Sequence, residues 1–318
     1  MRIRCSSATK GPTRMTRTAA VLATVLISAA ACSGPWRTTD DWQVVWREDF
    51  DGAEGAPPSS DDWIVDTGTG YPGGVPHWGT GEVQTHTADP SNISLDGSGH
   101  LTITPRRDAT GAWTSGRVES KRSDFKAPDG GVLRIEGRVR MPDVTGDAAL
   151  GYWSAFWALG APYRGDYWNW PEVGEVDVME NVNGVDQVWG VLHCGVELGG
   201  PCDEPDGLGG SAPCPGSSCL AEFHTYAFEW DRGTRPNEFR WYVDGQRYHS
   251  VDETRVGAGP WAAMTSHSGY FVLLNVSVGG GFPNGVARRD TPTASTAPDK
   301  SMVVDHVSVS TKTAAGRH

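Results

Sequence analysis

Positive charge is scarce in this sequence. Lys and Arg number 27 against 39 Asp and Glu residues, which leaves a formal net charge of −12 at pH 7. A surface with this balance repels the phosphate backbone of nucleic acids and anionic lipid headgroups. We therefore expect no nucleic-acid partner, and a neutral ligand suits the chain better than a polyanion.

The apolar run near the N-terminus is too short to cross a bilayer comfortably. It covers residues 19–31, 13 in all, and five cationic residues precede it: Arg2, Arg4, Lys10, Arg14 and Arg17. A basic segment followed by a short apolar run predicts a signal peptide over residues 1–31. Its removal takes away these five cations and no acids, so the formal charge of the mature part falls from −12 to −17.

The end of the apolar run suits two kinds of processing. Cys32 follows three alanines and is expected to carry a lipid, as in bacterial lipoproteins; ordinary cleavage within the alanines is the alternative, and an uncleaved anchor is a weaker one. Met15 could be the true start, because residues 15–31 would form a signal by themselves. We expect an extracellular or cell-surface protein whose only membrane contact is a lipid on Cys32, with residues 32–41 as a linker.

Cysteine is limited to six residues, and no C-x-x-C pair occurs, which argues against a zinc site. Cys5 and Cys32 belong to the signal. The others fall within 26 residues: Cys194, Cys202, Cys214 and Cys219. Outside the cytoplasm they predict two disulfides with three possible pairings. We favour Cys194–Cys202 and Cys214–Cys219, because neighbours in a loop close most easily.

The sequence has no convincing amphipathic helix of ten residues or more. Short strand-like runs with turn signals between them recur instead, at residues 42–46, 63–65, 101–104, 133–140, 152–159, 188–193, 225–230, 239–243, 246–249, 271–278 and 302–309. This pattern predicts an all-β sandwich or barrel. We expect one domain over residues 42–310, followed by a tail over residues 311–318.

One strand-like segment, Glu-Val-Asp-Val-Met-Glu at residues 175–180, holds three carboxylates. Alternation along a strand puts Glu175 and Asp177 on one face. A regular strand would turn Glu180 to the other face, whereas a β-bulge with one extra residue would return it. We assign Met179 as that extra residue.

Acids gathered on one strand face are costly, because buried carboxylates lose hydration and repel one another. A retaining glycosidase needs this arrangement, with one ionised nucleophile and one protonated general acid. Glu175 would be the nucleophile and Glu180 the acid/base, while Asp177 would hold Glu175 and separate the two pKa values. The alternative is a solvated strand face with acids present by chance.

Residues 175–180 also resemble the signature of glycoside hydrolase family 16, in the form with an extra residue that is typical of its laminarinase branch. Residues 78–84, 154–159, 190–193 and 274–280 agree with the family in order and spacing. The resemblance implies a jelly-roll sandwich of two curved antiparallel sheets with a substrate cleft on the concave face. It also implies a retaining endo-β-1,3-glucanase that needs no catalytic cofactor, binds β-glucan and is monomeric. The alternatives are a mixed-linkage β-1,3(4)-glucanase, a transglycosylase or a non-catalytic β-glucan-binding protein.

Several polar and aromatic residues are candidates for substrate contact, because sugar C–H faces stack on indole rings and sugar hydroxyls seek polar groups. They are Trp170, His193, Trp157, Trp78, Asn275, Gln84 and Arg117. The resemblance supports Trp170 and His193 in particular, and a place in the core is the alternative for each aromatic residue. It further implies a structural calcium ion held by Asp305, with Asp49 and Gly99 as further ligands; calcium takes six to eight oxygens.

Overall fold

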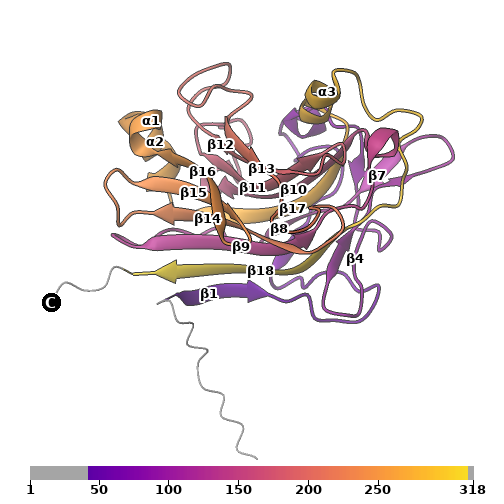
Figure 1. The fold of residues 1–318 in the computed structure, drawn as a ribbon, viewed down its shortest axis with the longest axis horizontal. Coiled ribbons are helices and arrows are strands. Elements are labelled where there is room, and N and C mark those ends of the chain that lie inside the picture. The colour runs from indigo at the N-terminus through magenta and orange to yellow at the C-terminus, as the bar shows by residue number, and fades with distance from the viewer. Residues whose placement is uncertain (1–41, 314–318) are drawn as a thin grey trace, which may run out of the picture. The chain divides into compact units, whose positions relative to one another are not determined.

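The computed structural model describes residues 42–313. The predicted signal peptide, Cys32 and the linker lie outside this range. Within it, two large antiparallel sheets stack face to face and a small third sheet lies beside them (Figure 1). The all-β sandwich predicted from the strand pattern is confirmed.

The first sheet has eight strands in the order β16-β15-β14-β9-β18-β5-β4, and β1 pairs with β18 beside β5. Its strands are β1 (Gln43–Glu48), β4 (Ile93–Leu95), β5 (Leu101–Ile103), β9 (Val132–Arg140), β14 (His224–Asp231), β15 (Glu238–Val243), β16 (Gln246–Asp252) and β18 (Met302–Lys312). β18 continues two residues past the predicted domain end at 310, because its last residues still pair with β9.

The second sheet has seven strands in the order β13-β12-β11-β10-β17-β8-β2. They are β2 (Trp63–Val65), β8 (Arg117–Ser120), β10 (Tyr152–Gly160), β11 (Glu175–Val182), β12 (Val188–His193), β13 (Leu208–Ala212) and β17 (Tyr270–Val278). The third sheet consists of β3 (Thr85–His86), β6 (Arg106–Arg107) and β7 (Trp113–Ser115).

Helices are short in the described part of the chain. The α-helices are α1 (Glu253–Val256), α2 (Ala258–Ser266) and α3 (Gly281–Ala287), and 3-10 turns cover Pro76–Gly79, Gly146–Ala149 and Ala161–Tyr163. The longest helix among residues 42–313 has 9 residues, which agrees with the prediction for that range. None of these helices is long and apolar enough to cross a membrane.

The hydrophobic core lies between the two large sheets and follows from strand alternation. In β9, Leu133, Ile135 and Val139 are buried while their neighbours are partly exposed. In β10, Tyr152 and Phe156 face the core from the opposite sheet. Each fully buried side chain of this size stabilises the fold by about 1.5–3 kcal/mol. The core therefore holds the second sheet in place and leaves its other face free for a site.

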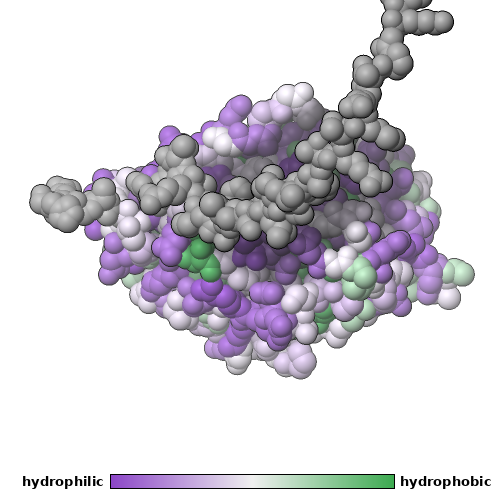
Figure 2. All heavy atoms as spheres, turned by 90° about the horizontal axis from the view of Figure 1, so that it is seen from below, coloured by the Kyte–Doolittle hydropathy of each residue, from purple (hydrophilic) through white to green (hydrophobic). Residues whose placement is uncertain are grey.

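Both predicted disulfides are present. Cys194 pairs with Cys202 and Cys214 pairs with Cys219, with Cα–Cα separations of 5.4 and 5.2 Å. The coloured surface visible in Figure 2 is mostly hydrophilic, and its hydrophobic residues lie in small groups.

Candidate active site

The predicted β-bulge is present in β11, between two of the three acids. Against β10, Asp177 lies opposite Trp157 and Met179 lies opposite Phe156, so Val178 has no partner. The register against β12 also shifts between Asp177 and Glu180. A bulge of this kind re-aims the side chains that follow it.

The bulge turns two consecutive side chains, Val178 and Met179, into the core, where both are fully buried. Glu180 then returns to the face that carries Glu175 and Asp177. Our assignment of Met179 as the extra residue was wrong by one position in the pairing with β10. The sequence shows only that one residue too many separates Asp177 from Glu180, whereas the hydrogen bonds of the neighbouring strand decide which one stays unpaired.

Two contacts fix β11 at this place. Gly174, just before the strand, has φ +80°, and a Cβ there would lie 2.7 Å from the Tyr270 hydroxyl, so glycine is required. Trp241 from the opposite sheet donates its indole N–H to the backbone carbonyl of Asp177 at 2.8 Å. A carbonyl at the bulge thereby gains the partner that every buried polar group needs.

The three acids lie in a cleft of about 920 Å³ on the second sheet, on the face opposite the core. Alternation places Trp153, Ala155, Trp157 and Leu159 of β10 in this cleft, while β17 contributes polar side chains. Nine of the ten predicted catalytic and substrate-binding residues line it: Glu175, Asp177, Glu180, Trp170, His193, Trp157, Trp78, Asn275 and Arg117.

Gln84 is the exception, because it is fully buried and is absent from the cleft lining. Its side-chain amide donates to Glu82, and its carbonyl accepts the backbone N–H of Val278 at 2.7 Å. Gln84 therefore connects the segment after residue 80 to β17. Gln84 was predicted to contact substrate, but its polar side chain makes these internal hydrogen bonds instead.

Glu180 is buried and has one strong donor. The indole N–H of Trp153 donates to its Oε1 at 2.7 Å. Burial, followed by the neighbouring Asp177 carboxylate, raises the pKa of Glu180 well above its ordinary value, although the Trp153 bond opposes the shift. Because Oε1 already accepts a hydrogen bond, the proton that Glu180 retains belongs on Oε2.

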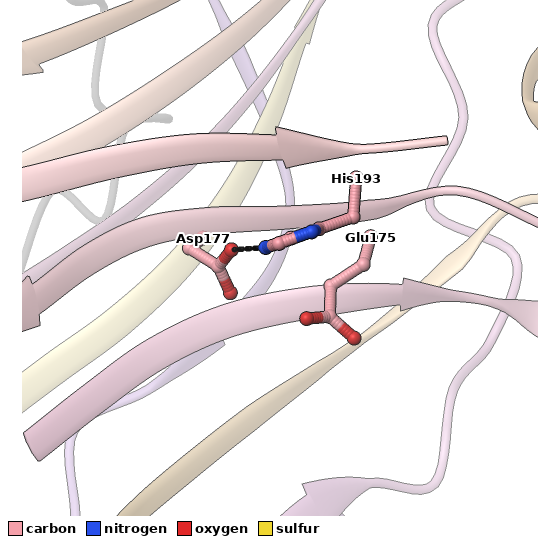
Figure 3. Close-up of side chains that lie close together, drawn as sticks. All are labelled: Glu175, Asp177 and His193. Carbon is pink, nitrogen blue, oxygen red and sulfur yellow. Dashed lines mark ion pairs between the residues drawn. The ribbon is translucent and has the colours of Figure 1, made fainter. Parts of the chain in front are cut away.

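Glu175, Asp177 and His193 form a tight group in which each offers a polar atom within 4.8 Å of the others (Figure 3). Glu175 lies opposite His193 in the pairing of β11 with β12. The His193 Nε2 lies 3.4 Å from Asp177 Oδ2, which makes an ion pair, and Nδ1 lies 2.7 Å from Glu204 Oε2. The imidazole is therefore held between two carboxylates.

The charges of this group depend on one another. Burial lowers the pKa of His193, but its bonds to Asp177 and Glu204 outweigh burial and raise that pKa well above its usual value. Burial, and then Asp177, raises the pKa of Glu175, while His193 acts in the opposite direction. His193 is thus a cation beside Glu175, and its charge favours the ionised form of that carboxylate.

Arg117 and the aromatic residues form one side of the cleft. The guanidinium lies 4.3 Å from the ring centre of Trp78 and 4.9 Å from that of Trp157, within the range of cation–π contact. Its charge is balanced by Asp66, which accepts from Nε at 3.1 Å. Trp157 donates its indole N–H to Asn275 at 2.7 Å, so this ring is fixed in orientation.

No family model matches the chain, but solved structures share its fold. The crystal structure of an endo-1,3-beta-glucanase from Streptomyces sioyaensis is 52% identical, with a TM-score of 0.85 over 89% of this chain and 100% of that one. The chain belongs to glycoside hydrolase family 16.

Two curated relatives agree with this family membership. A "Beta-glucanase" of Rhodothermus marinus is 29% identical over 93% of this chain and 95% of its own length. A "Glucan endo-1,3-beta-glucosidase" of Cryptopygus antarcticus is 27% identical over 77% of this chain and 83% of its own length. The jelly-roll sandwich implied by the family resemblance is confirmed.

Several residues in and behind the cleft of this family 16 chain were not predicted from the sequence. Trp153 lies four residues before Trp157, so strand alternation could have placed both on the same face. Trp189 lies opposite Glu180 in β12, and Phe282 of α3 packs against Trp153 and Trp189. Glu204 had no local signal, because it contacts His193 from a loop.

The three residues predicted to bind calcium do not line the cleft. Asp305 lies at a register shift in β18 and makes an ion pair with Arg138, and its carboxylate also contacts His306. Asp49 pairs with Arg47, although its backbone carbonyl faces Gly99. Both carboxylates therefore already have cationic partners, and these residues fit a calcium ion poorly. Calcium stays a prediction of the resemblance, and no catalytic step depends on it.

Proposed function

We propose that the chain hydrolyses β-1,3-linked glucans at internal bonds and retains the configuration at the anomeric carbon. The observation that carries the proposal is the bulged strand β11, which brings Glu175, Asp177 and Glu180 to one side of an open cleft. Family membership and the glucanase relatives support the same activity.

In the first step, Glu175 attacks the anomeric carbon and Glu180 protonates the departing glycosidic oxygen. The cation of His193 and the carboxylate of Asp177 lie beside Glu175, so the nucleophile faces a fixed electrostatic environment. The bond from Trp153 leaves Oε2 of Glu180 as the oxygen that carries the proton.

In the second step, Glu180 is ionised and removes a proton from water, which attacks the glycosyl-enzyme ester on Glu175. Departure of the sugar restores both carboxyl groups. The mechanism requires opposite protonation states of the two glutamates. The cation of His193 beside Glu175 favours its ionised form, while burial and the Asp177 carboxylate favour the protonated form of Glu180.

The surroundings of the acids favour cleavage inside a chain of neutral sugars. Trp170 packs against His193 with ring centres 5.6 Å apart on the side of Glu175, and Trp189 lies opposite Glu180. Aromatic faces thus flank the acids on both sides and can hold sugar rings before and after the cleaved bond. The charge of Arg117 is balanced by Asp66, which suits an uncharged glucan.

We further propose that the enzyme acts outside the cytoplasm as a monomer, with a lipid on Cys32 as its membrane contact. The two disulfides support an oxidising location. Globomycin treatment, which blocks lipoprotein signal cleavage, tests the lipid: it should cause a heavier precursor to accumulate, and unchanged processing would contradict lipidation.

The activity is tested with a panel of purified polysaccharides: laminarin, a mixed-linkage glucan, cellulose oligomers, agarose and a carrageenan. We expect reducing ends from laminarin first, as a series of oligosaccharides, with the β-anomer of the product formed initially as seen by proton NMR. Release of the α-anomer would contradict retention. Binding of laminarin without any new reducing ends would instead favour the glucan-binding alternative.

A further inference from the structure

A fourth carboxylate, Glu204, lies behind the three acids and was not predicted to belong to the site. Its side chain is fully buried and uses both oxygens: Oε2 lies 2.7 Å from His193 Nδ1, and Oε1 accepts the backbone N–H of Cys194 at 2.8 Å. A carboxylate removed from water in this way is costly unless its partners compensate. Its two bonds converge on the end of β12, next to the catalytic strand.

The loop that carries Glu204 is closed at both ends. The Cys194–Cys202 disulfide joins the residue after His193 to a residue two before Glu204. Within the loop, Gly199 and Glu204 exchange two backbone hydrogen bonds, each 2.7 Å long. Glu204 is therefore fixed relative to β12 through covalent and hydrogen-bonded links.

The His193 ring is confined on its remaining sides. Trp170 lies against one side, and Gly207 approaches so closely that a Cβ there would be 2.8 Å from His193 Cε1. With Nδ1 held by Glu204, the ring can direct only Nε2 toward Asp177. Which nitrogen of a histidine faces the reaction is set by the partner of the other nitrogen.

On the basis of the proposed hydrolytic function, we propose that Glu204 is a positioning residue of the reaction. It orients His193 and keeps it a cation, completing a carboxylate–histidine–carboxylate chain from Glu204 through His193 to Asp177, beside the nucleophile. The Cys194–Cys202 disulfide serves this chain by fixing the loop that carries Glu204.

Because His193 is a cation, one more carboxylate beside its ring is favourable, even though three acids already lie near it. Glu175, Asp177 and Glu180 face His193 from β11, and Glu204 faces it from the loop. Without Glu204, only the acids of β11, with Asp177 first among them, would offset the burial of the imidazole. Loss of its proton would then leave Glu175 and Asp177 without their nearest cation.

The first test follows the His193 ring by NMR titration, with a His193→Gln spectrum to assign its signals, and requires no activity. In the wild-type protein we expect both ring nitrogens to stay protonated through neutral pH, whereas Glu204→Gln should shift the titration to lower pH. A wild-type ring that titrates near the ordinary value of about 6.5 would overturn the proposal. So would the same titration in both proteins.

The second test is kinetic and uses laminarin. Glu204→Gln keeps an acceptor for Nδ1 but removes the charge, so its rate should fall more at pH 8 than at pH 5 relative to wild type. Glu204→Ala removes both and should lower kcat by about tenfold or more at every pH, the size expected for losing a charged hydrogen bond. Unchanged kcat and pH profile in both variants would exclude a positioning role.

Asp203→Asn is the matched control. Asp203 precedes Glu204 on the same loop, loses the same charge, and pairs with Arg255 at the surface. We expect its kcat to stay within about twofold of wild type. An equal fall in Asp203→Asn and Glu204→Gln would show that the net charge of the loop matters, not the bond to His193, and would overturn the proposal.

A double Cys194→Ser, Cys202→Ser variant tests the role of the disulfide. It keeps Glu204, so its kcat should lie between those of wild type and Glu204→Ala, whereas Cys214→Ser, Cys219→Ser should change stability alone. Equal kcat values in the two double variants would refute the disulfide's part. If the wild type does not cleave laminarin, the proposed function fails, while the NMR titration still decides the Glu204–His193 coupling.

Discussion

Trp153 donates its indole N–H to Oε1 of Glu180 at 2.7 Å, from the strand next to the one that carries the acids. One indole thus fixes the rotamer of the acid/base residue and leaves its second oxygen for the substrate. Burial and Asp177 raise the pKa of Glu180, and this hydrogen bond is the largest influence that lowers it. Catalysis by Glu180 therefore depends on β10 as well as on β11.

Trp153→Phe should lower kcat by about tenfold, because the ring remains while the donor is lost. Without that bond the pKa of Glu180 rises further, so the alkaline limb of the kcat/KM profile should move to higher pH. The measurement is the rate on laminarin between pH 4 and 10. A fall in kcat with an unmoved alkaline limb would indicate a packing effect instead of a bond to the acid.

Glu175→Gln and Glu180→Gln should each remove most of the activity while the fold is kept. The first loses the nucleophile, and the second loses acid and base assistance, which typically supplies 10²–10⁴-fold. Circular dichroism checks the fold, and reducing-end release checks the rate. Either variant with more than about a tenth of the wild-type rate would contradict the proposed mechanism.

Glu180→Gln should also make the protein more stable at neutral pH. Unfolded Glu180 loses its proton near its ordinary pKa of about 4.3, whereas the folded group retains it to higher pH. Between the pKa of the unfolded group and that of the folded group, the wild type loses stability as pH rises. Glutamine does not titrate and so removes this dependence. The Tm difference between variant and wild type should therefore grow from pH 4 to pH 8.

Glu222→Gln is the control for this stability effect, because Glu222 is exposed. Its Tm should follow that of the wild type at every pH. A Tm difference for Glu180→Gln that does not change with pH would show that Glu180 titrates normally in the folded protein.

Met179→Ala should destabilise the fold by about 2–5 kcal/mol, since the side chain is fully buried in the core. At temperatures where it stays folded it should keep at least a tenth of the activity, because the bulge acts through the backbone. Deleting Met179 leaves one residue fewer between Asp177 and Glu180 and so removes the bulge, and we expect lost activity or a changed linkage preference. Denaturant melts and the glucan panel measure these outcomes, and a deletion with unchanged activity would argue against the bulge.

Reduction of the disulfides should lower stability by about 2–4 kcal/mol. The comparison is between thermal melts with and without a reducing agent, after mass spectrometry has counted the free thiols. Four free thiols in the exported protein would contradict the pairings seen in the structure.

The features that depend on neighbouring residues could be predicted from the sequence. Strand alternation, the three acids of residues 175–180, the need for one extra residue between Asp177 and Glu180, and the pairing of neighbouring cysteines all depend on residues close together in the chain. Short polar strands such as β8 were missed, because their stability comes from pairing with β17 and β2.

Only the tertiary structure decided which groups surround the acids. Trp153 reaches Glu180 across 27 positions, Arg117 meets Asp66 across 51, and Glu204 contacts His193 from a loop closed by a disulfide. The same holds for the bulge, where the partner strand left Val178 unpaired. The sequence by itself determined which side chains could do the chemistry. The packing of distant strands decided their hydrogen-bond partners and burial, which set their charges, because no local pattern encodes which segments meet.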